Sequence, residues 1–465
     1  MAATRIRRLV DRHAGPALRL AGLTVTGDLD LGGTTMEFDL ELVDCVIDGA
    51  LLLTGASGRR VDLTGTSVRR VAADALRLTG DFVLRGARVG DATGVSRPLA
   101  GSGGPGGDRV VVAQRVLEHS VPAVFRASGA RIDGDLVLED TRLVSDRQWT
   151  LFAERMWLGG SLKAARLSST GALYLRQAHI GGQVLLNGAD AGGVDLTAGE
   201  VSLGFCADWG FTAHGEIRLR GAQVGNVVTF HDALLSPPGG ALNLARLRTP
   251  RLRLDFRDAP GGWVVLRDAQ VDSLVDAEQA WPAEGRLDVE GLGYRRIAST
   301  GQVDAGGRVR WLTRDRRASA GSFEQLALSY ERSGDARGAR IVRRARERHT
   351  RAKDGLPGRL WGALQDLLFG YGYVPHRALG WLLVLVAAGS TWFALRPPGP
   401  TRKEGPAWDP VLYTLDLIIP IANLGHRAAW NPLGADKVVA VVLILAGWLL
   451  ATAVIAGVGR VFSRS

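Results

Sequence analysis

A short phrase recurs from about residue 20 to residue 275 and limits the folds open to this chain. Each copy is a glycine followed by alternating apolar residues and often by Gly-Ala, as in GDLDLGG from Gly27, GDFVLRGARVG from Gly80 and GEIRLRGAQVG from Gly215. Alternation with a period of two predicts a short strand with one buried face. A unit this short can bury that face only against neighbouring copies, so the repeat predicts a solenoid.

The predicted fold class is mainly β, a right-handed parallel β-helix (solenoid) followed by a helical hairpin and a two-span transmembrane helical module. The chain has 61 glycines, and glycine permits the positive φ angles that tight corners need. An antiparallel sandwich is the alternative, but it predicts hairpin turns and longer strands than these repeats offer. The residues expected in the core are Leu29, Leu31, Leu136, Leu138, Leu185, Leu219 and Val265.

The pattern changes several times along the chain. Phe323, Leu326, Ala327 and Tyr330 have helical spacing, and FEQLALSYERSGDARGARIV resembles one hairpin of a tetratricopeptide-type repeat. A lone copy makes no peptide groove, so this hairpin is expected to be a linker. The predicted divisions are an N-terminal cap at 1–19, the solenoid at 20–281, an end cap or linker at 282–318, a basic helical hairpin at 319–355 and a membrane module at 356–465.

Two long apolar runs lie in the last region. Residues 378–395 and 438–458 carry no charge, and a helix of about 20 apolar residues crosses a lipid bilayer. These runs are therefore predicted membrane spans, with a buried soluble helix as the alternative for each. Trp381, Trp392 and Trp448 suit interface or bundle positions.

The distribution of charge predicts the orientation of these spans. The chain has a net charge of +10, and a basic stretch from Asp335 to Arg377 directly precedes the first span. Arg460 and Arg464 follow the second, so both flanks are expected in the cytoplasm. The first residues contain no apolar core typical of a secretory signal. We therefore expect a multi-pass protein of the bacterial inner (cytoplasmic) membrane, with the solenoid and both termini in the cytoplasm.

The basic stretch also predicts a partner, the anionic phospholipid membrane. Lipid headgroups would be held by Arg337, Arg340, Arg343, Arg344, Arg346, Arg348, Arg351 and Lys353. A solvated helix face is the alternative. No nucleic acid is expected, because the stretch lacks interleaved aromatic residues and a known binding module.

A third apolar stretch, residues 409–432, lies between the spans. Asp416 and Pro420 interrupt it, so it is expected to be re-entrant or to lie along the membrane interface. Two spans around a re-entrant segment resemble the pore module of two-span cation channels, although no Thr-Val-Gly-Tyr-Gly filter is present. The candidate pore or interface residues are Asp416, Pro420, Asn423 and Gly425.

No familiar chemical motif stands out elsewhere. Gly101, Gly103 and Gly106 spell G-x-G-x-x-G, but they fall in a predicted loop without the strand and helix that a dinucleotide site needs. Cys45 and Cys206 are 161 positions apart and form no metal-binding or redox spacing. The sequence assigns no catalytic, cofactor-binding or metal-binding residue.

Two weaker groupings are conceivable. His179 and His231 stand beside predicted strands and could share a face, while exposed or hydrogen-bonded histidines are the plainer interpretation. A cluster of four acids on one turn could form an acid–base pair, as in polysaccharide-cleaving β-helices, or could be ordinary surface acids. These acids are Asp133, Asp135, Glu139 and Asp140.

The whole layout resembles a set of actinobacterial membrane-associated β-solenoid proteins. The resemblance rests on the repeat region, on YGYVPHRALGWLL from Tyr371 and on LYTLDLIIPIANLGHRAAWNP from Leu412. It implies the architecture and the membrane location. Such proteins are often labelled membrane-associated oxidoreductases, so the resemblance also implies a redox enzyme, for which these residues supply no cofactor motif.

Three functions follow from these observations. The first is a non-catalytic, membrane-anchored scaffold or binding protein, whose solenoid face engages a protein partner or a second copy of the chain. The second is an oligomeric two-span channel or sensor with a regulatory solenoid. The third is the oxidoreductase of the family label. The first and second differ in whether residues 409–432 line an axis between subunits.

Overall fold

A computed structural model describes residues 1–90, 123–236, 241–352, 375–401, 406–419 and 424–462 of the chain. The chain divides into two compact units, Met1–Val342 and Arg343–Ser465. Each unit is described by itself.

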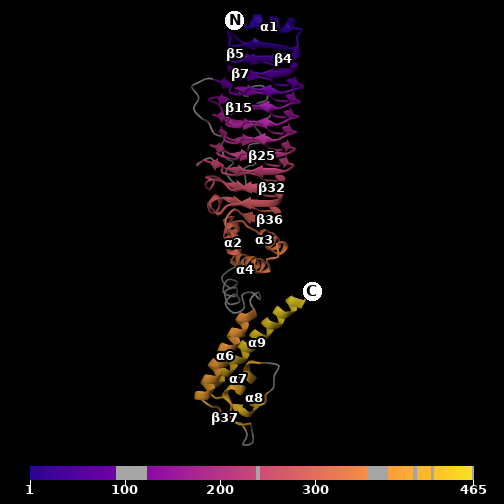
Figure 1. The fold of residues 1–465 in the computed structure, drawn as a ribbon. Helices are drawn as coiled ribbons and strands as arrows, with labels where there is room; N and C mark the ends of the chain where they lie inside the picture. The colour runs from indigo at the N-terminus through magenta and orange to yellow at the C-terminus, as the bar shows by residue number, and fades with distance from the viewer. Residues whose placement is uncertain (91–122, 237–240, 353–374, 402–405, 420–423, 463–465) are drawn as a thin grey trace, which may run out of the picture. The chain divides into compact units, whose positions relative to one another are not determined.

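The first unit contains a parallel β-solenoid of about 11 turns (Figure 1). The strands pair in parallel from turn to turn, so the predicted solenoid is confirmed and the antiparallel sandwich is excluded. Like residues stack through the core: Ile132 lies beside Leu158, and Leu158 beside Ile180. This stacking builds one continuous apolar core from many short strands.

Two stacks of strands form the sides of the solenoid. The first sheet contains β1 (Ala17–Ala21), β4 (Thr35–Val43), β6 (Ser57–Asp62), β8 (Arg77–Leu78), β9 (Phe82–Val83), β12 (Arg131–Ile132), β13 (Leu136–Val137), β16 (Trp157–Leu158), β17 (Leu162–Lys163), β20 (His179–Ile180), β21 (Val184–Leu185), β24 (Glu200–Val201), β25 (Gly204–Cys206), β28 (Gln223–Val224), β29 (Val227–Thr229), β32 (Arg248–Leu254), β34 (Gln270–Asp276) and β36 (Gly293–Ser299). The second contains β2 (Thr24–Val25), β3 (Leu29–Asp30), β5 (Val46–Leu52), β7 (Ser67–Ala72), β10 (Arg88–Gly90), β11 (Phe125–Arg126), β14 (Arg142–Val144), β15 (Trp149–Phe152), β18 (Ser168–Ser169), β19 (Ala172–Tyr174), β22 (Asp190–Ala191), β23 (Val194–Asp195), β26 (Thr212–Ala213), β27 (Ile217–Arg218), β30 (Leu234–Leu235), β31 (Leu242–Asn243), β33 (Val264–Val265) and β35 (Leu287–Asp288).

The predicted core residues are buried with one exception. Leu136, Leu138 and Leu219 have no exposed surface. Leu185 is only partly buried, because its neighbours Val184 and Leu186 face the core. In a run of three apolar residues, the alternation does not reveal which parity points inward, so the prediction was one residue out of register here.

Left-handed backbone marks the corners between the two sheets. Gly86, Gly188 and Gly221 take φ angles of 65°, 67° and 66° there. Within the described ranges, eleven residues other than glycine also take positive φ, among them Gln177 and Ala198. The corners are therefore set by the solenoid geometry and are occupied by glycine only in part.

The glycines that open most strand phrases have a different role from the one predicted; Gly27, with a φ of 87°, is an exception. Gly134 and Gly160 do not adopt positive φ. A Cβ on Gly160 would lie 2.7 Å from the carbonyl oxygen of Gly134 in the preceding turn. Adjacent turns thus approach so closely at Gly160 that a side chain there would collide with the preceding turn. The predicted positive φ is instead found at the glycine of the Gly-Ala pair that ends the phrase, as at Gly86 and Gly221.

Helices cover both ends of the solenoid. At the N-terminal end, α1 (Ala3–Arg12) buries Ile6 and Val10, and the Arg7 guanidinium donates to the carbonyl oxygen of Asp30 at 2.8 Å. At the other end, strands continue beyond the predicted limit at residue 281 as far as Ser299. The 3₁₀ helix η3 (Glu278–Ala280) interrupts them, and α2 (Ala305–Thr313) and α3 (Ala320–Arg332) follow. The end strands therefore do not offer bare edges.

The predicted helical hairpin corresponds to α3 and α4 (Ala336–Ala352). The Ser319 hydroxyl accepts a hydrogen bond from the Ser322 N–H at the start of α3. Gly334, at φ 82°, ends that helix, and the Asp335 carboxylate accepts from the Gly338 N–H in the first turn of α4.

The second unit is a small helical assembly. It contains α6 (Pro375–Leu395), α7 (Pro410–Ile418), α8 (His426–Ala429) and α9 (Ala435–Phe462), with a short antiparallel pair of β37 (Gly399–Pro400) and β38 (Trp430–Asn431). Its core gathers Phe393, Tyr413, Leu417 and Leu443. Gly447 of α9 passes so close to the Ile418 backbone that a side chain there would collide.

The predicted spans 378–395 and 438–458 belong to α6 and α9. Among the residues that the structure describes, no helix is both long enough and apolar enough to cross a membrane. The side chains of residues 375–379 and 449–462 lie outside that description. Membrane crossing by these helices stays a prediction.

Candidate binding surfaces

The second unit exposes an apolar surface. Val438, Val441, Val442, Leu445 and Trp448 recur at three- and four-residue spacing along one face of α9, and each is about half exposed or more. The opposite face packs into the core of the unit. A helix on the surface of a water-soluble domain normally turns polar residues to the outside.

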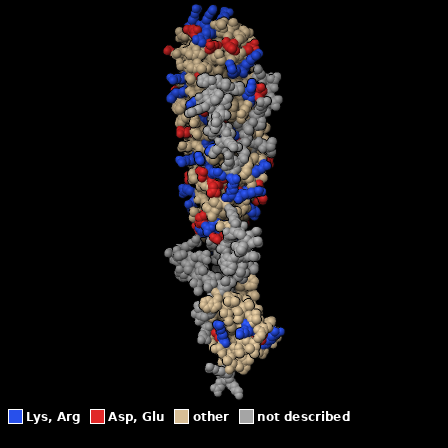
Figure 2. Space-filling view, turned by 180° about the vertical axis from the view of Figure 1, so that it is seen from behind, with Lys and Arg blue, Asp and Glu red and all other residues tan. Residues whose placement is uncertain are grey.

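Exposed apolar side chains are concentrated in this unit. Thirteen of the nineteen exposed large hydrophobic side chains found among the described residues belong to it. Figure 2 shows one face of the unit mostly in tan, whereas Lys, Arg, Asp and Glu are spread over the solenoid. Apolar surface of this extent usually marks contact with lipid or with another protein.

The predicted pore residues fall in and after α7. Asp416 is buried, and its two carboxylate oxygens accept hydrogen bonds from the Leu424 and Arg427 N–H groups at 2.9 and 2.7 Å. Gly425 takes a φ of 76° and directly precedes α8. Pro420 and Asn423 lie outside the described residues. Asp416 therefore fixes the return of the chain after α7.

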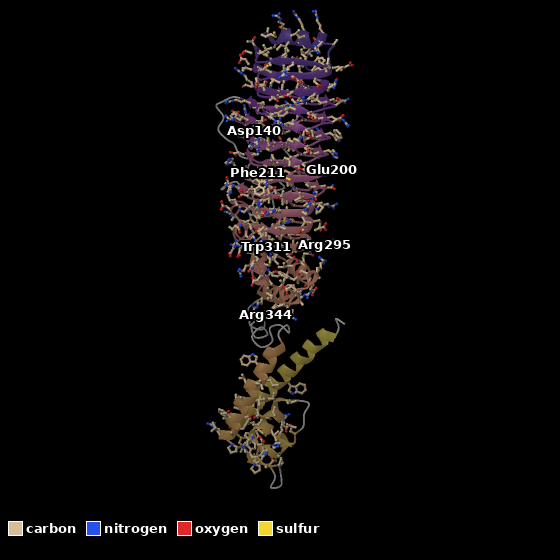
Figure 3. The ribbon with its side chains drawn as sticks, viewed as in Figure 1. Asp140, Glu200, Phe211, Arg295, Trp311 and Arg344 are labelled. Atoms are coloured by element: carbon tan, nitrogen blue, oxygen red, sulfur yellow. The ribbon has the colours of Figure 1, made fainter. Side chains whose placement is uncertain are left out.

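The predicted lipid-binding arginines lie on α4, where Arg344 is labelled in Figure 3. Arg337, Arg340 and Arg348 are exposed, Arg344 and Arg346 are partly buried, and Arg346 pairs with Glu347 at 3.1 Å. Arg343 turns inward and is 7% exposed, so it is not placed for contact with headgroups. The side chains of Arg351 and Lys353 are outside the described part.

A row of polar side chains runs along the outside of the first sheet, with one residue per turn. This outer row contains Arg77, Arg131, Trp157, His179, Glu200, Gln223, Arg248 and Gln270. Glu200 is labelled in Figure 3. Each member follows a left-handed corner by two residues, as Trp157 follows Arg155 and Glu200 follows Ala198. The sequence interpretation missed this row.

Planar groups stack on one another in the middle of the row. The Arg131 guanidinium carbon lies 3.9 Å from the Trp157 ring centroid. The Trp157 and His179 rings are 5.9 Å apart and nearly parallel. Next along the row, His179 Nδ1 lies 3.2 Å from the Glu200 carboxylate. Stacking and pairing hold these side chains in place.

Hollows lie along the outer row. The first, here called the Arg77 hollow, has a volume of about 590 Å³ and is lined by Ser57, Gly58, Arg77, Leu78, Thr79, Gly129, Arg131 and Asp133. A second of about 370 Å³ contains His179, Glu200 and Arg248. A third of about 400 Å³ contains Gln270, Tyr294 and Gln325. The outer row thus borders several open polar hollows.

The candidate acid–base cluster is made of separate ion pairs. Asp133 pairs with Arg131 at 3.2 Å, and Glu139 with Arg85 at 2.7 Å. Asp140, labelled in Figure 3, receives a two-pronged hydrogen bond from Arg166, which lowers the pKa of its carboxyl group.

Asp135 is paired in the same way. Burial opposes ionisation of Asp135, but the Lys163 ammonium and the Ser161 N–H lower the pKa of its carboxyl group. With Asp133, Glu139 and Asp140 also in ion pairs, each of the four acids has its own cationic partner. The four carboxylates therefore form separate ion pairs and not a shared acid–base pair.

The two highlighted histidines contact different partners. His179 lies in the outer row, whereas His231 pairs with Asp255 at 2.8 Å and meets the edge of the Trp209 ring. The Arg253 guanidinium lies 3.0 Å from His231 Nδ1, so this imidazole is already engaged. The structure therefore gives no shared histidine site.

Cys206 is a poor nucleophile. Burial, together with the nearby Asp208 carboxyl group, raises the pKa of the Cys206 thiol to about 11. The thiol is therefore almost wholly protonated near neutral pH, and the thiolate is the reactive form.

Cofactor and metal candidates remain unsupported. Gly101, Gly103 and Gly106 lie outside the described residues. In the described ranges, no group of three or more His, Cys, Asp or Glu side chains is placed to hold a metal ion.

Comparison with known proteins gave no match among protein-family models, curated proteins or solved structures.

Proposed function

We propose that this protein is a non-catalytic solenoid scaffold anchored in the bacterial inner membrane. Residues 356–465 are the anchor, with spans at about 378–395 and 438–458 and an interfacial or re-entrant segment at 409–432. The solenoid and both termini lie in the cytoplasm. The observation that carries this proposal is the apolar outer surface of the second unit.

The energetic argument concerns the α9 face. Val438, Val441, Val442 and Leu445 leave much of their side-chain surface exposed. Burying apolar surface is worth about 25 cal/mol per Å², so this face is unfavourable in water and favourable in hydrocarbon. A lipid environment would satisfy it without any change in the packing of the unit.

Charge supports the orientation. Arg377 directly precedes the first span and Arg460 follows the second, while the exposed arginines Arg337, Arg340 and Arg348 lie earlier in the same basic stretch. Basic residues beside a span favour the cytoplasmic side, and each contributes about 1 kcal/mol near anionic lipid. Anionic phospholipid is therefore the partner proposed for the basic helix.

The scaffold assignment rests on how the solenoid uses its polar groups. The acids and histidines considered as catalytic candidates are held in ion pairs or hydrogen bonds. What the solenoid offers is a stacked outer row beside open hollows, an arrangement suited to binding. A protein partner is the occupant proposed for this face, with a second copy of the chain as the alternative. The channel is the less favoured proposal, because both oxygens of Asp416 serve hydrogen bonds within the chain.

Vesicle flotation tests the anchor. The full chain, reconstituted with vesicles of phosphatidylglycerol and phosphatidylcholine and washed at alkaline pH, is expected to float with the lipid. A Val441→Asp/Leu445→Asp double variant should float at least about tenfold less, since each charge at mid-membrane costs about 2.5–3.5 kcal/mol. The matched control is Leu203→Asp, which places the same charge on an exposed apolar residue of the solenoid.

The control and the wild-type protein decide the result. Leu203→Asp should float like the wild type. A full chain that stays dispersed in detergent-free buffer and does not float would refute membrane anchoring. So would equal loss of flotation in the solenoid control.

A further inference from the structure

We infer that the Arg77 hollow binds a small anionic ligand through a phosphate or carboxylate group. Its volume of about 590 Å³ lies in the range that small-molecule sites occupy. The hollow belongs wholly to Met1–Val342. This inference deepens the proposed scaffold function by naming a ligand class, but its test does not depend on whether the second unit enters a membrane.

The charges that line the hollow do not balance. Arg77 and Arg131 are direct partners in adjacent turns, which lie about 4.8 Å apart. Asp133, the one carboxylate among the described lining residues, pairs with Arg131 at 3.2 Å. Arg77 has no ion pair or side-chain hydrogen bond within the described part of the chain, so an anion between the two guanidinium groups would relieve their repulsion.

Arg131 is held ready for such a ligand. Its guanidinium group stacks 3.9 Å above the Trp157 ring, whose other neighbour in the row is His179. Asp133 bonds the Nε of Arg131, so the terminal nitrogens remain the donors closest to solvent. An arginine fixed in this way loses little conformational freedom on binding, and its planar fork matches phosphate and carboxylate.

The remaining lining leaves room for the anion and supplies further polar groups. Gly58 and Gly129 have no side chains, and the hydroxyl groups of Ser57 and Thr79 border the same space. The Ser57 hydroxyl donates to the Thr35 hydroxyl at 3.2 Å. Compact anions are therefore favoured over apolar ligands.

The second sheet provides a natural comparison. Arg88 and Arg142 are also direct partners in adjacent turns. In the turn before Arg88 the paired residue is Ser67, just as Ser57 is the residue paired with Arg77 in the turn before it. Ser168 follows Arg142, whereas Trp157 follows Arg131. Arg142 therefore has no stacked ring in that position, and this pair lines none of the hollows described above.

Calorimetric titration of the purified full chain tests the inference, with inorganic pyrophosphate and citrate as the probes. Saturable binding to one site is expected for at least one probe. Arg77→Gln and Arg131→Gln should each weaken it by about ten- to a hundredfold, as expected for a lost charge-assisted hydrogen bond. Arg142→Gln should leave it unchanged. Binding of pyrophosphate alone would identify a phosphate site, and binding of citrate alone a carboxylate site.

The Arg77→Lys variant controls for loss of binding that is caused by misfolding. It keeps the charge but lacks the planar fork, so intermediate binding is expected with an unchanged unfolding midpoint. The inference is overturned if neither probe saturates, if Arg142→Gln loses as much binding as Arg77→Gln, or if folded Arg77→Gln binds like the wild type. Each of these results would leave the flotation experiment unaffected.

Discussion

Two kinds of glycine serve this solenoid, and they differ in what they would tolerate. Gly221 stands at a corner with a φ of 66°, and a Cβ added there would have no neighbouring atom within 4 Å. Gly181 has ordinary backbone angles but lies against the backbone of Gly159 in the preceding turn. The first needs a conformation, and the second needs the absence of a side chain.

Paired substitutions separate these roles. Gly221→Asn should be nearly neutral, because asparagine tolerates left-handed backbone, while Gly221→Ala should cost about 1–2 kcal/mol of unfolding free energy. At Gly181, alanine and asparagine should both be destabilising, by about 1–3 kcal/mol, because any Cβ forces the turns apart. Urea unfolding measures these differences. A neutral Gly181→Ala would contradict the close-approach role.

This distinction also explains what the sequence could and could not predict. The glycine phrase reveals a solenoid, but corners at Gln177, Ala198 and Arg155 carry no residue typical of left-handed backbone. The boundaries of these turns could therefore not be recognised in the sequence, and the outer row could not be predicted. Aligning the chain on its corners brings Arg131, Trp157 and the other row members into one column.

The helices that end the solenoid are joined to it by a buried ion pair. Arg308 of α2 donates to both oxygens of Asp276 in β34, at 2.6 and 2.8 Å. The Trp281 indole N–H donates to the same carboxylate, and Arg308 also donates to the Ala298 carbonyl oxygen. Both charges are almost fully buried, so each depends on the other.

Loss of this pair should be costly. Arg308→Met leaves the Asp276 carboxylate buried without its cation and should lower the unfolding free energy by about 3–5 kcal/mol. Arg257→Met is the matched control, since it breaks an exposed pair with Asp232 and should leave the unfolding free energy nearly unchanged. Denaturant unfolding of both variants measures the difference. Equal stability would show that α2 does not secure the end of the solenoid.

Elements were predictable to the extent that their patterns were periodic. Helical spacing marked α3 and α4 from the sequence. The sequence prediction ended the solenoid at residue 281, because the segment from Pro282 falls out of the spacing of the earlier repeats and a 3₁₀ helix, η3, lies just before it. One further copy of the phrase, GRLDVEGL from Gly285, nevertheless forms β35, and β35 and β36 pair in parallel with β33 and β34 of the preceding turn.

At the scale of the molecule, the scaffold proposal predicts a protein that does not form rings. End helices cover the first and last turns, and the Gln325 side chain donates to the Tyr294 carbonyl oxygen in β36. Asp416, the leading pore candidate, is used within its own chain. From the sequence, only the apolar segments pointed to a class of function, that of a membrane-anchored protein. The outer row and its hollows could not be predicted, because their residues lie far apart in the sequence and meet only when the turns stack.

The mass of the full chain in detergent should therefore be that of a monomer over a wide range of concentration. Light scattering after size-exclusion chromatography makes this measurement. Asp416→Asn should lower the thermal stability of the protein and leave its mass unchanged. A closed ring of defined size would instead favour the channel proposal.

Because the register is constant from turn to turn, the number of turns sets the length of the solenoid. Each turn uses about 22 residues, as from Trp157 to His179, and adds about 4.8 Å together with one position of the outer row. Duplicating or deleting one turn would change the reach by one such step while leaving both end structures intact. The length of the solenoid therefore changes in steps of one turn, and adding or removing a turn needs no change in the packing of the remaining core.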